Sequence, residues 1–373
     1  MNVNYIGPLR KQQGLTQTEL GDRLGVTRQT VAVWERGERL PSFGQISRIA
    51  DALNVPVDLF IKPTEGDPIT LLFRADDSAA LTAALKAQIQ VQVEDYVGLE
   101  EELGETPALP PAWPLDTYDE AKAERIAREL RDFLGVEDAP LGDVINLMED
   151  KGFKVILTSL PAGVSGFSAY TEEWGGVIVV NADKPVERQY FTALHELAHL
   201  VCHRKDYQSG NVPGVRDPRE KIANHVAGGM LLSRETMERE LRGFQHQWLP
   251  EPLLINLKRR YSVSMRTVLM RAKQLDMITA KQCGQQIGKL TKEYGREDEP
   301  AHLKRHRDLF LNVDGKDIEG AGVARTRLER LVYEAASKEM ITRSRAAEIL
   351  NMPAMQVRRN LGAWTSDGAG AAD

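Results

Sequence analysis

The chain has 373 residues, 42% hydrophobic and 27% charged, a composition typical of globular proteins of two or three domains rather than of disordered or fibrous ones. Its formal net charge of −6 argues against a protein that coats nucleic acid along its whole length. No apolar run reaches the roughly 18 residues of a membrane span, no secretion signal opens the chain, and two cysteines cannot build a disulfide framework, so we expect a cytoplasmic protein without a membrane partner.

The segment 5–60 is predicted to form a bundle of five short helices. The second and third, TQTELGDRL and TRQTVAVWERG, are separated by the short turn of a helix-turn-helix, with Gly25 where the backbone must be left-handed. Leu20, Leu24, Val31 and Trp34 are expected to fill the angle between these helices. Residues 1–62 carry eight Lys or Arg against six Asp or Glu, a small basic excess that permits contact with DNA.

In a helix-turn-helix the start of the second helix of the pair enters the major groove. Arginine can bond guanine, glutamine can bond adenine, and small apolar side chains can touch the thymine methyl group, while a helix amino terminus can hold a phosphate. The candidate DNA-binding residues are therefore Thr16, Gln17, Thr27, Arg28, Gln29, Ala32 and Val33. The alternative is a small helical bundle that contacts another protein.

Two proline-rich stretches then mark domain boundaries, near residue 62 and at 106–116, where four prolines forbid a continuous helix. Between them, residues 78–103 have helical apolar spacing and end in Glu100, Glu101 and Glu102. We expect a connecting helix with a solvated acidic end. The sequence thus predicts a helix-turn-helix domain over 1–65, followed by a helical connector and a proline-rich linker over 66–116.

Residues 117–235 are predicted to form a small α+β domain. The strands FKVILTSL and WGGVIVVNA are rich in β-branched residues and are separated by a glycine-containing connection. The remaining elements have helical periodicity. The expected helices cover residues 119–134, 141–151, 186–203 and 219–232.

The helix at 186–203 contains HELAH, formed by His195, Glu196 and His199. Residues four apart lie on one face of a helix, so both imidazoles can bind a single tetrahedral zinc ion. Glu196, one position round the helix, can act as the general base toward the water that such an ion activates. The alternatives are a buried helix whose histidines only form hydrogen bonds, and a metal that stabilises without catalysis.

A catalytic zinc site needs a third protein ligand and one open position. The third histidine of a metzincin would fall at Lys205, so that arrangement fails, and Glu220 in REKIANHVAGGMLLS is the better candidate. Asn224, one turn further on, is a candidate second-shell residue. His203 is expected to be a partly exposed neighbour. Two imidazoles and a carboxylate suit Zn²⁺, although ligand type alone does not exclude manganese.

Residues 236–373 are predicted to be mostly helical. A hairpin within 325–364 has the spacing of a second helix-turn-helix, with Arg343, Arg345, Arg358 and Arg359 on the outside. Helices packed as a regulatory or dimerising bundle are the favoured alternative. The tail SDGAGAAD is expected to be disordered.

Two of these segments resemble known families. Residues 4–60, including SFGQISRIADALNV, resemble the lambda-repressor-like XRE family, which implies binding to short palindromic double-stranded DNA operators, usually as a homodimer. Residues 119–278, through VIVVNA, ERQYFTALHELAHLVCH and EKIANHVAGGMLLS, resemble the ImmA/IrrE metallopeptidases. That likeness implies His195, His199 and Glu220 as ligands and Glu196 as the base. The chain departs from it at Ile222, where a second acid is common, and at Ser233, in place of a proline.

The sequence therefore predicts a multidomain, mainly α-helical regulator of bacterial or phage origin, with a small zincin-like α+β core. Its function would be DNA binding combined with zinc-dependent cleavage of a specific protein, and the resemblance implies a repressor cleaved in a stress, phage or mobile-element response. The alternative is an antitoxin-like or sensor regulator, in which the peptidase-like domain binds metal, a toxin or another partner without proteolysis.

Overall fold

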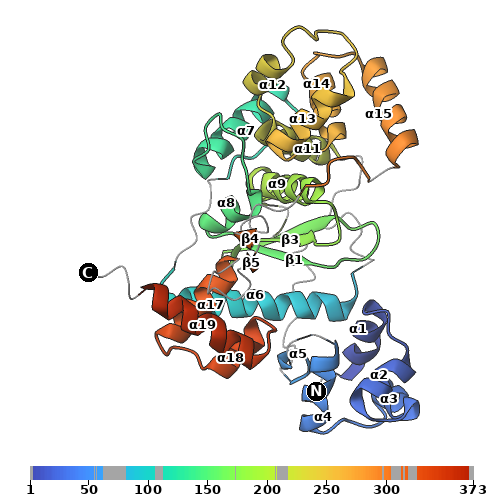
Figure 1. Cartoon of the computed structure of the whole chain (residues 1–373), viewed down its shortest axis with the longest axis vertical. Coiled ribbons are helices and arrows are strands. Elements are labelled where there is room, and N and C mark those ends of the chain that lie inside the picture. The colour runs from blue at the N-terminus through green and yellow to red at the C-terminus, as the bar shows by residue number, and fades with distance from the viewer. Residues whose placement is uncertain are drawn as a thin grey trace. The chain divides into compact units, whose positions relative to one another are not determined.

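The computed structural model describes residues 3–53, 55, 57–61, 81–105, 112–172, 174–205, 207, 217–295, 298–303, 312–313, 316–317 and 326–368. These residues fall into two compact units (Figure 1). The first unit contains the described residues of 3–61, 81–105 and 326–368, and the second unit contains those of 112–317. The expected mainly helical architecture with a small sheet is confirmed. In the described ranges no helix is both long and apolar enough to cross a membrane.

The amino-terminal part of the first unit is the expected helical bundle. Thr16 accepts a hydrogen bond from the backbone N–H of Glu19 and caps the second helix, which ends at Gly25 with φ 68°. Leu20, Leu24, Val31 and Trp34 are buried in one core, which confirms the predicted wedge. The elements described here are η1 (Val3–Tyr5), α1 (Ile6–Gln12), α2 (Gln17–Leu24), α3 (Arg28–Glu35), α4 (Phe43–Leu53) and α5 (Asp58–Ile61).

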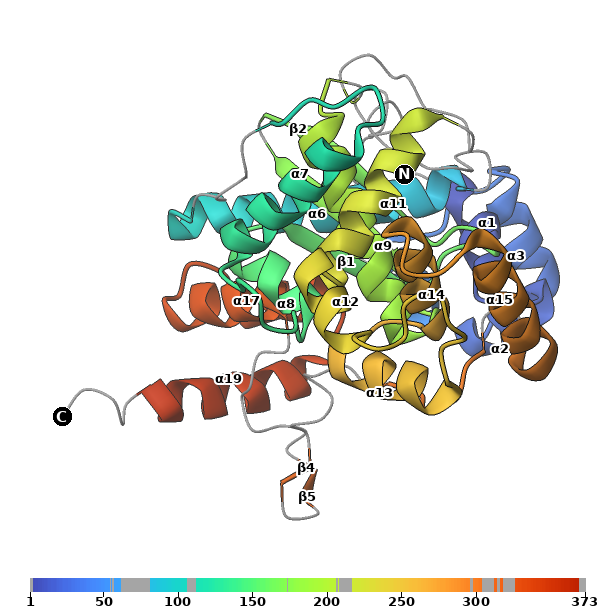
Figure 2. The ribbon, with the colours of Figure 1, turned by 90° about the horizontal axis from the view of Figure 1, so that it is seen from above.

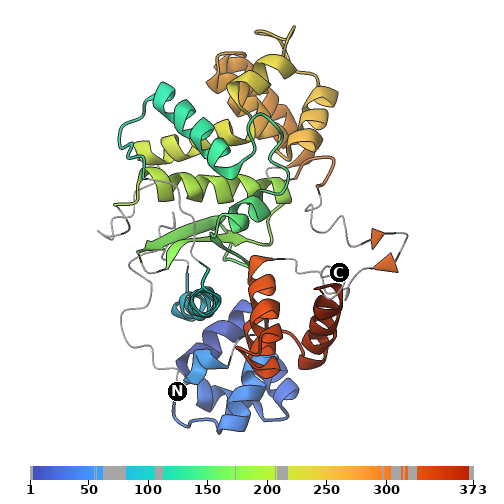
Figure 3. The same cartoon turned by 90° about the vertical axis from the view of Figure 1, so that its left-hand side faces the viewer.

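The expected connecting helix is α6 (Ala83–Leu103), and it contributes to two cores of the first unit. Ala84 and Ala87 are buried with the helices of the amino-terminal bundle. Tyr96 and Leu99 are buried with three helices from the end of the chain. Figure 3 views α6 along its axis, with these neighbours around it. The three helices are α17 (Arg327–Ser337), α18 (Arg343–Ile349) and α19 (Ala354–Gly368).

The acidic end of α6 is not simply solvated. Glu100 is 4% exposed and accepts a hydrogen bond from Arg327. Glu105, beyond the helix, accepts hydrogen bonds from Arg327 at 2.7 Å and from Arg330 at 2.8 Å. The expectation of a solvated end failed at Glu100 because the partner arginines come from the opposite end of the sequence.

The sheet of the second unit contains β1 (Lys154–Thr158), β2 (Gly166–Thr171) and β3 (Gly175–Asn181) among the described residues. The order is β1-β3-β2, with β3 parallel to β1 and antiparallel to β2. β2 lies in the segment expected to be a glycine-containing connection, so that expectation was wrong. Gly166 is required there, because a Cβ atom would lie 2.5 Å from Thr192 Cγ2. This close approach packs β2 against the helix that follows the sheet.

That helix, α9 (Val186–Cys202), packs on β2 and β3, and α11 (Pro218–Leu231) packs against both α9 and α7 (Glu120–Leu134) (Figure 2). Helices beyond residue 235 enter the same core, since Leu254, Leu257 and Val268 are buried in it. The other elements described in this unit are α8 (Val144–Asp150), α12 (Arg234–Glu240), α13 (Glu251–Tyr261), α14 (Met265–Gln274), α15 (Ala280–Tyr294), β4 (Asn312–Val313) and β5 (Lys316–Asp317).

A buried charge cluster fixes the start of α9 against α13. The Lys258 side chain is fully buried, and its Nζ donates to Glu187 at 2.5 Å and to Glu299 at 3.3 Å. Glu299 also accepts from Arg266 at 2.9 Å. Paired charges of this kind avoid most of the cost of burial only while every partner is present.

Candidate metal centre and nucleic-acid interface

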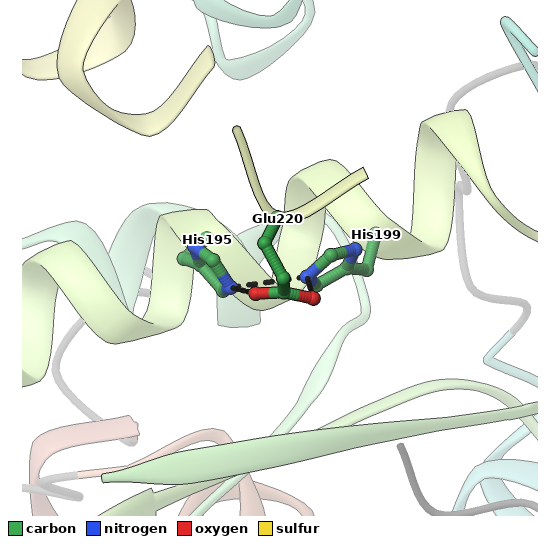
Figure 4. A group of neighbouring side chains, drawn as sticks. All are labelled: His195, His199 and Glu220. Atoms are coloured by element: carbon green, nitrogen blue, oxygen red, sulfur yellow. Dashed lines mark hydrogen bonds and ion pairs between the residues drawn. The ribbon is translucent and has the colours of Figure 1, made fainter. Parts of the chain in front are cut away.

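Three side chains from two helices meet beside the sheet (Figure 4). His195 and His199 lie one turn apart on α9, and Glu220 lies in the first turn of α11. The two Nε2 atoms are 3.0 Å apart. Glu220 Oε2 lies 3.2 Å from His195 Nε2, and Oε1 lies 3.2 Å from His199 Nε2. The sequence-predicted trio is thus brought together in space.

These separations fit a small tetrahedral cation. Bonds of about 2.0–2.1 Å in a tetrahedral site place two ligand atoms about 3.3 Å apart, close to the observed 3.0 and 3.2 Å. Nitrogen and carboxylate donors are also the set that zinc takes in catalytic sites. The residues present therefore fit a zinc ion.

His203 determines the tautomer of His199. The Nε2 atom of His203 lies 3.1 Å from the Leu115 carbonyl oxygen, and Nδ1 lies 2.9 Å from His199 Nδ1. A carbonyl only accepts, so a neutral His203 must donate from Nε2 and accept at Nδ1. His199 then donates from Nδ1 and directs the lone pair of Nε2 toward Glu220. In this tautomer the His199 lone pair and the Glu220 carboxylate face each other at 3.2 Å, an arrangement that a cation between them would satisfy.

Glu220 is in the form that binds metals. Burial acts to raise the pKa of its carboxyl group, but the adjacent imidazoles of His195 and His199 outweigh burial and hold that pKa well below 4.5. The side chain is a carboxylate at neutral pH, and it is 11% exposed.

Glu196, the expected base, is held by the sheet. Its side chain is buried, and Oε2 accepts a hydrogen bond of 2.5 Å from the Ser168 hydroxyl on β2. Ser168 Oγ also lies 2.7 Å from the Tyr207 hydroxyl. The sequence alone does not point to either residue, because Ser168 is distant from HELAH and Tyr207, although only eight residues after His199, belongs to no motif.

A cavity of about 1060 Å³ opens beside Glu220, one of the three candidate ligands. It is larger than most small-molecule sites, a size that suits a polypeptide segment. Asn224 lies on its wall, and among the described residues its side chain makes no hydrogen bond to the three candidate ligands, so a supporting role for Asn224 stays a prediction. The wall also includes Tyr118, Phe191, Glu220, Lys221 and Met270.

Three further residues on or next to α9 and α11 are buried in the core around the candidate metal centre. His225 is fully buried, with Nε2 2.7 Å from Glu124 and Nδ1 2.9 Å from the Tyr118 hydroxyl. Cys202 is a buried core residue, and burial raises the pKa of its thiol to about 12. His203, expected to be partly exposed, is 2% exposed because it binds His199.

The candidate DNA-binding residues lie at and around the turn between α2 and α3. Thr27, Arg28 and Gln29 are exposed, whereas Ala32 and Val33 are half-buried. Three of the seven have intramolecular partners, among them Thr27, whose hydroxyl caps α3 by accepting from the Thr30 backbone N–H at 3.2 Å. Thr16 caps α2, and Gln17 donates to Glu35 at 2.8 Å.

Comparison with known proteins finds matches to the amino-terminal helical bundle and to the domain that carries the candidate metal centre. The sequence model of the family described as Helix-turn-helix matches residues 9–60. A 59-residue stretch is 48% identical to an uncharacterized HTH-type transcriptional regulator of Methanothermobacter thermautotrophicus, covering 15% of this chain and 86% of that protein. The regulator YqaE of Bacillus subtilis is 33% identical over 60 residues, which are 16% of this chain and about half (52%) of YqaE.

The chain therefore belongs to the HTH-type transcriptional regulators through its amino-terminal domain. Residues 148–273 match the model of the Peptidase M78 family, described as the IrrE N-terminal-like domain. This stretch contains HELAH and Glu220, so the molecule is a helix-turn-helix regulator fused to a peptidase-like domain.

Solved structures show only distant likeness. A Mycobacterium tuberculosis transcriptional regulator covers 49% of this chain and 51% of its own, with 18% identity and a TM-score of 0.31. Bacillus thuringiensis PlcR, solved with the peptide PapR7 and DNA, covers 100% of this chain and 99% of its own, with 12% identity and a TM-score of 0.19. Likeness at this level carries no argument about function.

Proposed function

We propose that this protein binds an operator through its first unit and cleaves a specific protein through a zinc-dependent endopeptidase site in its second unit. The observation that supports the peptidase most directly is the convergence of His195, His199 and Glu220 beside a cavity of about 1060 Å³. The peptidase-like family match over residues 148–273 supports the same assignment. A specific repressor is the proposed substrate, cleaved in a stress, phage or mobile-element response.

Each side chain has a distinct task in this proposal. His195 and His199 would hold the ion through Nε2, and Glu220 through its carboxylate. A bound zinc ion would supply a Lewis acid and lower the pKa of a nearby water molecule. Glu196 would accept the proton of the attacking water and pass it to the leaving amine. Ser168, by donating to Oε2, would fix the carboxylate during both transfers.

The operator would be read by α3. Arg28 and Gln29 are exposed at the amino-terminal end of this helix, where the side chains of a helix-turn-helix reach base edges. Ala32 and Val33 would touch thymine methyl groups. Thr16, Gln17 and Thr27 would contact phosphates, and binding as a homodimer would match a palindromic operator.

Two measurements test the peptidase. Elemental analysis of the purified chain should find about one zinc per chain, and His199→Ala should lose it. Amino-terminal profiling of cells that express the wild type should reveal a new protein terminus that is absent with Glu196→Gln. Glu238→Gln, an exposed substitution on α12, is the matched control. A terminus that also forms with Glu196→Gln would refute the proposal.

A second candidate is a regulator whose metal domain senses a partner, such as a toxin, without proteolysis. Fusion of this domain to an operator reader in one chain favours it, because an enzyme does not need its own operator specificity. In that case Arg28→Ala combined with Gln29→Ala should abolish the effect on transcription, whereas Glu196→Gln should leave it unchanged.

A further inference from the structure

The helices at the end of the chain repeat the amino-terminal helix-turn-helix at a constant offset. Gln17 begins α2 and Arg343 begins α18, while Arg28 begins α3 and Ala354 begins α19. Arg343 follows Gln17 by 326 residues, and Ala354 follows Arg28 by the same number. The first helix and the turn therefore have the same combined length in the two motifs.

The cap and the turn are equivalent as well. Thr16 and Thr342, at the same offset, each cap the first helix by accepting a hydrogen bond from the backbone N–H three residues on. Gly25 has φ 68° and Asn351 has φ 50°, so both backbones are left-handed at the same position of the turn. Glycine and asparagine are the residues that adopt this conformation most readily.

The hydrogen bonds that close the two turns also match. Val26 N–H donates to the Gly21 carbonyl at 2.9 Å, and Met352 N–H donates to the Ala347 carbonyl at 2.9 Å. Inside the second helix of each pair, Val31 and Val357 occupy equivalent positions and are fully buried. The motifs thus share backbone geometry and the direction of their buried faces, although few of their residues are identical.

Because the buried faces coincide, the exposed faces coincide too. In α19 the positions equivalent to Gln29, Ala32 and Val33 carry Met355, Arg358 and Arg359, with Gln356 beside them, and all four side chains are exposed. Arg343, at the start of α18, is exposed as well. Within the described residues these three arginines form no ion pair, whereas Arg345 is paired with Asp95 at 2.5 Å.

The charge of the second motif is suited to a polyanion. Residues 342–361 contain four Arg and one Glu, a net charge of +3, whereas residues 16–35 contain two Arg and three acids, a net charge of −1. Unpaired arginines on a helix of this geometry match both the phosphates and the guanine edges of a duplex. A dimerisation face would instead be expected to be apolar.

Both motifs are attached to one helix. Ala84 and Ala87 of α6 lie in the core of the first motif, and Tyr96 and Leu99 lie in the core of the second. The two attachment points are about 12 residues apart, or about 18 Å along the helix axis. One chain therefore holds two such motifs in a single compact unit.

We propose that α18 and α19 form a second DNA-reading motif, which binds double-stranded DNA adjacent to the half-site read by α3. Arg358, Arg359 and Gln356 contact base edges from the major groove, and Arg343 contacts a phosphate. This inference extends the proposed operator binding by α3, and the two can fail separately.

The test uses the full chain and a random double-stranded DNA library. Selection on the wild type followed by footprinting should give a site with two contacted segments. Arg358→Ala with Arg359→Ala should lose one segment, weaken binding about tenfold or more, and reduce the dependence of log K on log salt by about one to two. Lys281→Ala with Lys292→Ala, exposed on α15, should change none of these.

The outcomes distinguish the two assignments. If Arg358→Ala with Arg359→Ala keeps wild-type affinity, salt dependence and footprint, the second motif is overturned and α17–α19 form a protein-packing bundle. If that variant loses one segment while Arg28→Ala with Gln29→Ala loses the other, both motifs read DNA. If only the Arg28 and Gln29 variant is silent, operator reading by α3 fails and the second motif stands.

Discussion

Glu124 lies in a charge cluster of the second unit and makes the stability of that unit sensitive to acid. Its carboxylate accepts hydrogen bonds from Arg271 at 2.6 and 2.9 Å and from His225 at 2.7 Å. Burial acts to raise the pKa of Glu124, but the hydrogen bonds from His225 and Arg271 outweigh burial and lower the pKa from 4.5 to about 2. The folded protein therefore binds this proton less readily than the unfolded chain does.

The linkage between proton binding and unfolding gives the direction of the effect of pH on stability and the pH range in which it occurs. A lowered pKa stabilises the fold fully above pH 4.5, and the contribution is lost as the pH falls toward 2. The difference between 4.5 and about 2 corresponds to about 3 kcal/mol of unfolding free energy, of which about 2 kcal/mol disappears between about pH 7 and pH 3. The Glu124 side chain is only 15% exposed, so screening by solvent reduces this free-energy contribution only slightly.

The assay compares the wild type with Glu124→Gln, in the presence of a chelator so that loss of metal does not contribute. Hydrogen exchange of the α7 and α11 amides in urea gives the local unfolding free energy at pH 7 and at pH 3. We expect the difference between the two proteins to shrink by about 2 kcal/mol at the lower pH. Glu129→Gln, near the surface of α7, is the control. An equal pH dependence in wild type and Glu124→Gln would refute the reasoning.

Three further substitutions test the cores and the turn. Lys258→Ala should destabilise the second unit by about 3–5 kcal/mol in thermal unfolding, because Glu187 loses its buried partner; unchanged stability would contradict this. His203→Phe should weaken zinc binding about 10–100-fold in competition with a chelating dye, with unchanged circular dichroism. Gly25→Ala should cost about 1 kcal/mol because of its left-handed backbone, whereas Gly44→Ala, in open space on α4, should not destabilise.

The candidate site was predictable where it depends on local periodicity. His195 and His199 are four residues apart on an amphipathic helix, so their common face follows from the helical repeat alone. Glu220 lies on a different helix, so the helical repeat does not place it beside the histidines, and its assignment depends on the family resemblance. His203 and Ser168 act through contacts with backbone and side chains from other elements. No spacing rule in one sequence predicts such contacts.

The fold was predictable where elements are long and regular. The helices of the amino-terminal bundle and α9 agree with their predicted positions to within a few residues. β2 was missed because its glycine-containing sequence has turn composition, while its strand character comes from pairing with β3. The four expected segments followed chain order, but the compact units do not, because α17–α19 pack on α6 although the whole second unit separates them in sequence.

This non-sequential packing makes α6 the helix that the two cores of the first unit share. Asp95 and Glu100 are buried carboxylates whose partners, Arg345 and Arg327, come from the final helices. Without those helices the two carboxylates would return to solvent, and Tyr96 would lose the core that buries it, so the main loss would be apolar burial. The other end of the same helix carries Ala84, which is buried in the core of the helix-turn-helix. The final helices therefore complete the compact unit that also contains the amino-terminal helix-turn-helix.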